Sequence, residues 1–342
     1  MINRRQKTNS SIVGEEHWKN NPYDLYISGW EARTYTEPGR GNNLEDNTMD
    51  LTGLTTEETN FFTDQGYLIF PEFLTPDHAE SVIQDISRLR ELRAGGYAER
   101  NTDANGSALV VTLPHLGGLT SYPPMVANIQ SLMGEAGFAL HHQHAERHQP
   151  GTPGSNWHHD YEQFPQIDRD QVMVHCFYYP NGLNGEIGDL ILLPRSHTAV
   201  MHRNAFSDKF YSEDLPGSLT VSDLPLGSAV VVHSALMHGR RGKPAGSGYC
   251  RYFTDVSYCQ AGEKMWPSYG FPFPKLWLRE QIRERALKAG HGRDGQYDFI
   301  FDTQIFYDPE TATEIQRQCM QQMIGSNQQR KGVRESVNPR AS

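Results

Sequence analysis

The 342-residue sequence predicts a mainly β protein with flanking helices, organised around a barrel or jelly roll. Beyond residue 108 the chain carries a series of short segments rich in β-branched and aromatic residues, separated by Gly, Pro and Asn. Long helical segments do not alternate with them, as they would in a parallel α/β sheet. Helical patterns lie before and after this strand region, so helices are expected to cover one of the sheets.

The chain begins with a polar, weakly periodic region, residues 1–50, which predicts a flexible N-terminal arm. Thr55 and Glu58 then form a capping-box pattern at the start of a short helix that ends at Gly66. Residues 67–70 are predicted to form a strand directly after it.

A longer helix follows, with Thr75 as its N-cap, Pro76 at its first position and a glycine pair at its end. Its predicted apolar face consists of Ala79, Val82, Ile83, Ile86, Leu89 and Leu92. A face of this width indicates a helix packed on one side.

The strand region and the C-terminal part divide the rest of the chain. The predicted strands are residues 108–114, 138–149, 171–180, 189–197, 228–238 and 249–258. Residues 274–291 and 309–325 are expected to be helical. We therefore expect a jelly-roll domain over residues 51–270, a helical extension packed on it over residues 271–325, and a flexible tail over residues 326–342.

Composition narrows the function classes. The net charge of −10 argues against a nucleic-acid partner, because neutralising phosphates requires a surplus of Lys and Arg. No apolar run approaches the roughly 20 residues that span a bilayer, which argues against a membrane protein. The first residues lack the apolar segment of a secretory signal, and the four cysteines form no C-x-x-C pair. These features predict a cytoplasmic protein.

Histidines on predicted strands indicate a metal centre. In "NWHHD", His158 and Asp160 are two residues apart, so an extended strand places them on one face and His159 on the other. Two histidines and one carboxylate are the typical ligands of non-haem Fe(II). A third ligand would have to come from a distant strand, where His233 and His238 have equal chemistry.

Arg251 is a candidate for binding a dicarboxylate co-substrate, because a guanidinium grips a carboxylate through two hydrogen bonds. It shares one strand face with Phe253 and Asp255. The alternative for Arg251 is an ion pair within the sheet, for example with Asp255.

Several motifs together resemble the phytanoyl-CoA dioxygenase family of Fe(II)/2-oxoglutarate-dependent oxygenases. They occur in the family's order over about residues 58–258 and read "FFTDQGYLIFPEFLTPDHAE", "NWHHD", "NGEIGDLILLPRSHT" and "LGSAVVVHSALMHG", followed by an arginine. The resemblance implies a double-stranded β-helix, a cupin-like jelly roll.

The resemblance also implies cofactors and roles. Fe(II) would be bound by His158, Asp160 and His238, which would be the catalytic centre, and 2-oxoglutarate by Arg251. The enzyme would use O2, release succinate and CO2, and oxidise a substrate C–H bond, most simply by hydroxylation. Further expected contacts are Gln143 with 2-oxoglutarate, and Tyr161, Gln163 and Phe164 with the substrate.

The sequence departs from the family at several points. "PRSH" stands where the family has Pro-Gly-Ser-His, and no Asn-x-Ser precedes Arg251. Asp160 stands where related halogenases have a small residue that leaves room for halide, so hydroxylation is favoured over halogenation. Two alternatives are a cupin-like metal enzyme without 2-oxoglutarate and a jelly-roll binding module without catalysis.

Overall fold

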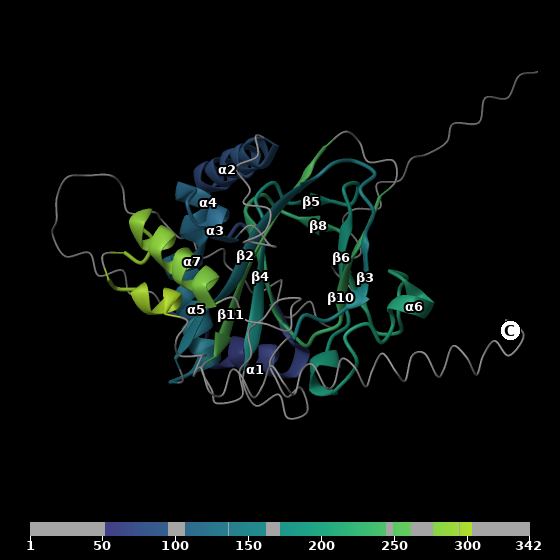
Figure 1. The fold of residues 1–342 in the computed structure, drawn as a ribbon. Helices are drawn as coiled ribbons and strands as arrows, with labels where there is room; N and C mark the ends of the chain where they lie inside the picture. Colours follow the sequence, from purple (N-terminus) through teal and green to yellow (C-terminus); the bar gives the residue numbers. More distant parts are fainter. Residues whose placement is uncertain are drawn as a thin grey trace, which may run out of the picture. The chain divides into compact units, whose positions relative to one another are not determined.

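Two antiparallel sheets that face each other form the centre of the structure, a computed structural model (Figure 1). It describes residues 52–94, 107–135, 137–161, 172–243, 249–260, 276–293 and 295–302. The predicted arm, the second C-terminal helix and the tail lie outside the described residues, so the predicted domain boundaries remain a prediction.

The larger sheet has five strands. In spatial order they are β1 (Tyr67–Phe70), β9 (Ser228–His233), β4 (Met173–Tyr179), β11 (Arg251–Gln260) and β2 (Phe138–His148). Residues of β4 are buried along its whole length, since helices cover one face of this sheet and the second sheet covers the other. This explains why β4 is a continuous apolar and aromatic run rather than an alternating one.

The smaller sheet has four strands, and a short pair completes the β structure. The four are β3 (Ser155–His158), β10 (His238–Arg241), β6 (Asp189–Leu192) and β7 (Leu219–Val221), and the pair is β5 (Leu183–Asn184) with β8 (Asp223–Leu224). The chain passes repeatedly from one sheet to the other between β2 and β11. This is a double-stranded β-helix, so the predicted mainly β fold with flanking helices is confirmed.

Helices pack on the outer face of the larger sheet (Figure 1). They are α2 (Pro76–Ala94), α3 (Ser107–Val110), α4 (Pro114–Gly118), α5 (Pro123–Met133) and α7 (Leu276–Lys288), with the turns η1 (Leu119–Ser121) and η3 (Asp298–Phe301). Helix α1 (Thr56–Gln65) lies instead at one end of the sheets, directly before β1 (Figure 1). The helix α6 (Ser207–Phe210) and the turn η2 (Ser196–Thr198) belong to loops of the smaller sheet's side. None of the described helices is long and apolar enough to cross a membrane.

The N-terminal predictions agree with the structure. The Thr55 side chain accepts from the Glu58 backbone N–H, and the Glu58 carboxylate accepts from the Thr55 backbone N–H at 2.7 Å. Gly66 ends α1 in the left-handed conformation, with φ of 84°, which a glycine adopts without a steric cost. Helix α2 begins at Pro76 and buries most of its predicted apolar face.

The prediction of a strand over residues 108–114 is wrong. These residues form α3, a turn and the start of α4, although Val110 and Val111 are fully buried. A short apolar run fits a buried strand and a buried helical turn equally well, so periodicity could not separate them. Here the buried run is itself part of the helical layer, where α3 contacts β2 and α7.

The arginine of "PRSH" preserves the turn that a glycine would make. Arg195 has φ of 68° and ψ of −4°, which is the left-handed region favoured by glycine. Its backbone N–H donates to Gln65 O at 3.0 Å, and its guanidinium lies 3.4 Å from Asp64. These contacts with α1 offset part of the conformational cost.

Asp85 joins two elements of the helical layer. It is buried on α2, and its Oδ2 accepts from the backbone N–H groups of His115 and Leu116 at 2.7 and 2.8 Å, at the start of α4. Both donors would lose their partner in its absence, and one of them is buried.

We therefore expect Asp85→Ala to lower the free energy of unfolding by about 2 kcal/mol, the cost of buried donors without partners. Urea unfolding followed by circular dichroism measures this change. The control is Gln84→Ala, an exposed position on the same helix, which should shift it by less than about 0.5 kcal/mol. Equal effects of the two substitutions would contradict the role of Asp85.

Candidate functional site

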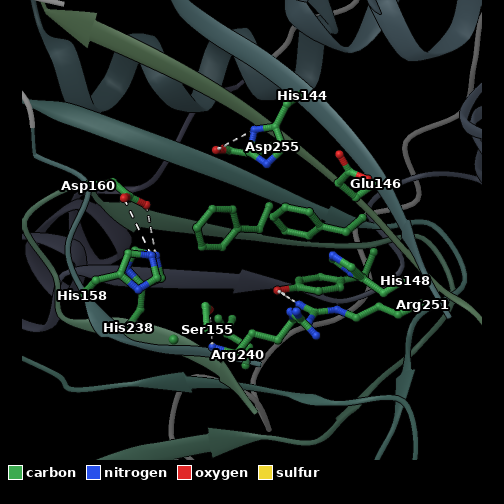
Figure 2. A pocket seen from close by; sticks show the side chains of 15 residues that line it. His144, Glu146, His148, Ser155, His158, Asp160, His238, Arg240, Arg251 and Asp255 are labelled. Atoms are coloured by element: carbon green, nitrogen blue, oxygen red, sulfur yellow. Dashed lines mark hydrogen bonds and ion pairs between the residues drawn. The ribbon is translucent and has the colours of Figure 1, made fainter. Parts of the chain in front are cut away.

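A cavity of about 230 Å³ opens between the two sheets (Figure 2). Its polar side chains come from both sheets. On one side lie His158, Asp160 and His238, and on the other His144, Glu146, His148, Arg251 and Asp255. Phe177, Tyr179 and Phe253 form an aromatic floor between them.

Sheet pairing brings the first group together. His158 ends β3 and His238 begins β10, and the two are directly opposite in the antiparallel register. Their rings are 4.5 Å apart between centroids. Gly239 permits this approach, since a Cβ there would lie 2.9 Å from Ser155 O.

Asp160 follows the end of β3 and reaches both histidines. Its Oδ1 lies 3.7 Å from His158 Nε2, and its Oδ2 lies 3.2 Å from His238 Nε2. One ligand atom from each of the three residues lies within 4.8 Å of the others. The backbone N–H of Asp160 donates to Ser234 O at 2.7 Å, which fixes the position of the residue beyond the strand.

Backbone carbonyls set the orientation of both rings. His158 Nδ1 donates to Asn156 O at 2.6 Å, and His238 Nδ1 donates to Leu236 O at 2.9 Å. Each Nε2 is then the ring nitrogen that faces Asp160. A histidine that donates through one nitrogen and offers the other is prepared to bind a metal.

Electrostatics favour ionised Asp160 beside neutral histidine. Burial opposes the charge of Asp160, but the interactions with His158 and His238 outweigh it and hold its pKa well below the usual range. Burial lowers the pKa of His158, and Asp160 opposes that shift only in part. Carboxylate and neutral imidazole are the protonation states that bind metal.

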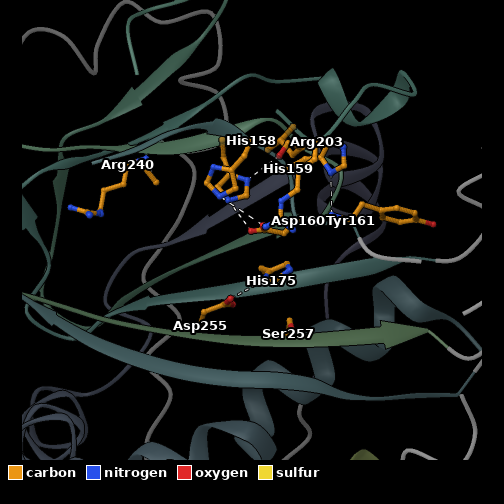
Figure 3. A network of polar contacts seen from close by, with 12 residues as sticks. His158, His159, Asp160, Tyr161, His175, Arg203, Arg240, Asp255 and Ser257 are labelled. Atoms are coloured by element: carbon orange, nitrogen blue, oxygen red, sulfur yellow. Dashed lines mark hydrogen bonds and ion pairs between the residues drawn. The ribbon is translucent and has the colours of Figure 1, made fainter. Parts of the chain in front are cut away.

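Sequence reasoning missed Arg203, which contacts the same carboxylate. Its Nη2 donates to Asp160 Oδ1 at 2.8 Å, and its backbone carbonyl accepts from His159 N at 3.1 Å (Figure 3). Arg203 lies in a loop 43 residues after Asp160, and no motif marks it.

The side chains of His159 and Tyr161, on either side of Asp160 in the sequence, point away from the cavity. His159 is fully buried, and its Nε2 lies 3.0 Å from Met201 O, away from the cavity as strand alternation predicts. Tyr161 does not line the cavity: it is buried against Met173 and Cys259, and its ring stacks on His233. The chain thus turns Tyr161 inward after Asp160, and its contact with substrate stays a prediction. Gln163 and Phe164 lie outside the described residues.

Gln143 also faces away from the cavity. Strand β2 turns His144, Glu146 and His148 toward the cavity, and the alternate residue Gln143 toward the helical layer. The Gln143 amide donates to Leu116 O at 2.6 Å. The period of two that separated His158 from His159 therefore also turns Gln143 away from the cavity, and its contact with 2-oxoglutarate stays a prediction.

Arg251 lies at the far end of the cavity and is 2% exposed. Its Nη2 donates to Tyr179 Oη at 3.2 Å, and its guanidinium carbon lies 5.2 Å from the Tyr179 ring centroid. Its Nε and Nη1 have no hydrogen-bond partner among the described residues, and no ion pair with Asp255 forms there. A buried guanidinium with free donors suits an anionic ligand such as 2-oxoglutarate.

Positive charge gathers around Arg251. Arg240 lines the same cavity, and burial together with the charge of Arg251 lowers its pKa to about 10. Burial, followed by the charges of Arg240 and Arg251, lowers the pKa of His148 to about 3. His148 is therefore neutral at pH 7, so the positive charge at this end of the cavity comes from the guanidinium groups of Arg240 and Arg251.

Comparison with known proteins agrees with this geometry. The family described as phytanoyl-CoA dioxygenase (PhyH) matches residues 62–242, more than half of the chain. No curated protein matches the sequence.

Solved structures resemble the fold at low identity. HygX from Streptomyces hygroscopicus, with nickel, 2-oxoglutarate and hygromycin B bound, is 18% identical over 62% of this chain and 90% of its own, with a TM-score of 0.49. EctD from S. alaskensis, with 2-oxoglutarate and 5-hydroxyectoine, is 14% identical over 64% and 80%, with a TM-score of 0.48. The carbocyclase SnoK from nogalamycin biosynthesis is 16% identical over 61% and 85%, with a TM-score of 0.47.

The lowered pKa of His148 predicts a pH effect on stability. A histidine in the unfolded chain has a pKa near 6.5 and therefore binds a proton below that pH. In the folded protein His148 binds this proton only near pH 3. The free energy of unfolding should therefore fall as the pH drops from 7 to 5. His148→Gln should make this fall smaller, as measured by urea unfolding at the two pH values. An unchanged pH dependence would show that His148 titrates normally.

Proposed function

The chain belongs to the phytanoyl-CoA dioxygenase family of non-haem Fe(II)/2-oxoglutarate-dependent oxygenases, and we propose that it hydroxylates a C–H bond of a small molecule. When bound, Fe(II), 2-oxoglutarate and O2 supply the oxidation, with release of succinate and CO2. One observation carries the proposal: a His-His-Asp group shares a cavity with a buried guanidinium that has free donors.

We assign the metal ligands to His158, Asp160 and His238. Their ligand atoms already converge, and the donor set is the one that non-haem Fe(II) prefers. Arg203 would hold the carboxylate of Asp160 in place through its 2.8 Å hydrogen bond. Three protein ligands on one face leave the other positions open to the cavity.

Arg251 is the proposed partner of the distal carboxylate of 2-oxoglutarate. Its unused Nε and Nη1 donors would pair with that carboxylate, while Tyr179 keeps the guanidinium in its orientation. Within the aromatic floor, the rings of Phe177 and Phe253 lie between the two ends of the cavity. We propose these two rings as an apolar wall against the substrate, in place of Tyr161, because they face the cavity.

The ligand assignment predicts that His158→Ala, Asp160→Ala and His238→Ala each abolish activity while the fold remains. Succinate release should fall by about 100-fold or more, since each change removes one of only three protein ligands. A screen of a metabolite library with Fe(II), ascorbate and 2-oxoglutarate provides the assay. Substantial turnover in any of the three variants would refute the assignment. The control is His159→Ala, which changes a neighbouring histidine outside the ligand set.

The role of Arg251 predicts weaker 2-oxoglutarate binding in Arg251→Ala. Loss of charge-assisted hydrogen bonds worth about 1.5–3 kcal/mol corresponds to a rise in Kd of roughly 10- to 100-fold. Anaerobic titration with Fe(II) and 2-oxoglutarate, followed by charge-transfer absorption, measures this Kd.

The matched control is Arg240→Ala, because the Arg240 guanidinium already donates to the carbonyl of Pro153. It should change the Kd much less. A larger effect of Arg240→Ala than of Arg251→Ala would move the carboxylate site to Arg240. Absence of any charge-transfer band in the wild-type protein would instead favour a metal enzyme that does not use 2-oxoglutarate.

A further inference from the structure

A second group of two histidines and a carboxylate lies at the opposite wall of the cavity, which His144 and Asp255 line and behind which His142 is buried. His142 and His144 lie on β2, and Asp255 lies beside them on β11, where the register pairs Asp255 with His144. Ligand atoms from these three residues lie within 4.8 Å of one another, as in the first group. Figure 2 shows His144 and Asp255 across the cavity from His158 and His238.

Asp255 is a buried charge that its surroundings do not fully satisfy. It is 2% exposed, and its Oδ1 has no hydrogen-bond partner among the described residues. In that part of the chain, the cationic groups within 4 Å of it are histidines alone. Since a buried carboxylate is costly without a compensating charge, a cation at this wall would stabilise it.

His144 presents its ring to Asp255 from the neighbouring strand. Burial lowers the pKa of His144 to about 4 against the opposing charge of Asp255, so its ring is neutral at pH 7. Its Nδ1 lies 3.8 Å from Asp255 Oδ2, too far for a hydrogen bond. Two ligands of one metal ion, each bound at about 2.0–2.2 Å, are about 3–3.5 Å apart, so a small shift of the His144 ring would suffice.

His142 is held in a position from which it can bind a metal. Its Nδ1 lies 2.8 Å from Ser257 Oγ, and its Nε2 lies 3.1 Å from Asp255 Oδ2. With the proton on Nε2, the ring donates to Asp255, as it would without a metal; with the proton on Nδ1, it donates to Ser257 and the Nε2 lone pair faces the carboxylate. The second arrangement is unfavourable without a cation and favourable with one between the two groups.

His175 also hydrogen-bonds the carboxylate of Asp255. Its Nδ1 donates to Asp255 Oδ2 at 2.7 Å, and it lies between Asp255 and Asp160 (Figure 3). A histidine that donates to a ligating carboxylate is a frequent outer contact of metal sites, because it fixes the orientation of the ligand.

We propose that His142, His144 and Asp255 form a second metal site, for a divalent first-row transition-metal ion, positioned by His175. Imidazole and carboxylate ligands suit Zn²⁺, Co²⁺ and Fe²⁺. Three protein ligands leave at least one position toward the cavity, which an oxygen atom of the substrate or a water molecule occupies. The site does not depend on the ligand assignment of the first group.

Metal stoichiometry tests the proposal without an assay of turnover. The untagged full-length chain, stripped with EDTA, is brought to equilibrium with Co²⁺, and bound metal is measured by mass spectrometry and by visible absorption. We expect two Co²⁺ ions per wild-type chain, one for each group. Asp160→Ala, Asp255→Asn and His144→Gln should each retain one ion, with different absorption spectra for loss at the first and second groups.

Matched variants make the result decisive. His148→Gln, on the same strand and the same cavity wall but outside the group, should still bind two ions. His144→Gln changes a half-buried ring, so it tests the site even if Asp255→Asn fails to fold.

The proposal is overturned if the wild type binds a single ion that Asp160→Ala loses, since the second group is then a hydrogen-bonded network only. It is equally overturned if two ions persist in both Asp255→Asn and His144→Gln. If Asp160→Ala keeps both ions while His144→Gln loses one, the first ligand assignment fails and the second stands.

Discussion

The antiparallel pairing of β3 with β10 is the constraint on which the site depends. Its register places His158 opposite His238, and the strand end carries Asp160 to within 3.2 Å of His238 Nε2. A register shift of one residue would turn one histidine to the other face of the sheet. The close approach at Gly239 and the Asp160 backbone hydrogen bond to Ser234 maintain this register.

The two sheets contribute different charged side chains to one cavity. The smaller sheet carries the carboxylate of Asp160 between His158 and His238, a donor set that suits a metal. The larger sheet carries Arg251 and, four residues later on the same face, Asp255. These opposite charges stay apart because four residues of extended strand span about 13 Å, and Tyr179 and His175 each hydrogen-bond one of the two side chains at its own end. The separation leaves each charge available for a ligand, which would be lost if they formed an ion pair.

Much of the fold and of the candidate site follows from local sequence signals. The capping box at Thr55, the strand boundaries of β1 and the apolar face of α2 depend on interactions within a few residues. Strand alternation alone separated His158 and Asp160 from His159. The same rule applied to β2 would have turned His144 toward the cavity and Gln143 away from it. The buried run at residues 108–114 could not be assigned, because burial there is set by α7 and β2 rather than by local periodicity.

The sequence by itself determined the family, the fold class and the candidate ligand types, since motif order and residue chemistry are properties of the chain. Tertiary structure alone decided which distant groups meet. It brings Arg203 to Asp160, turns Tyr161 into the core, and gathers His142, His144 and His175 around Asp255. These contacts link strands and loops that are many residues apart, and only sheet register and loop packing fix such distances.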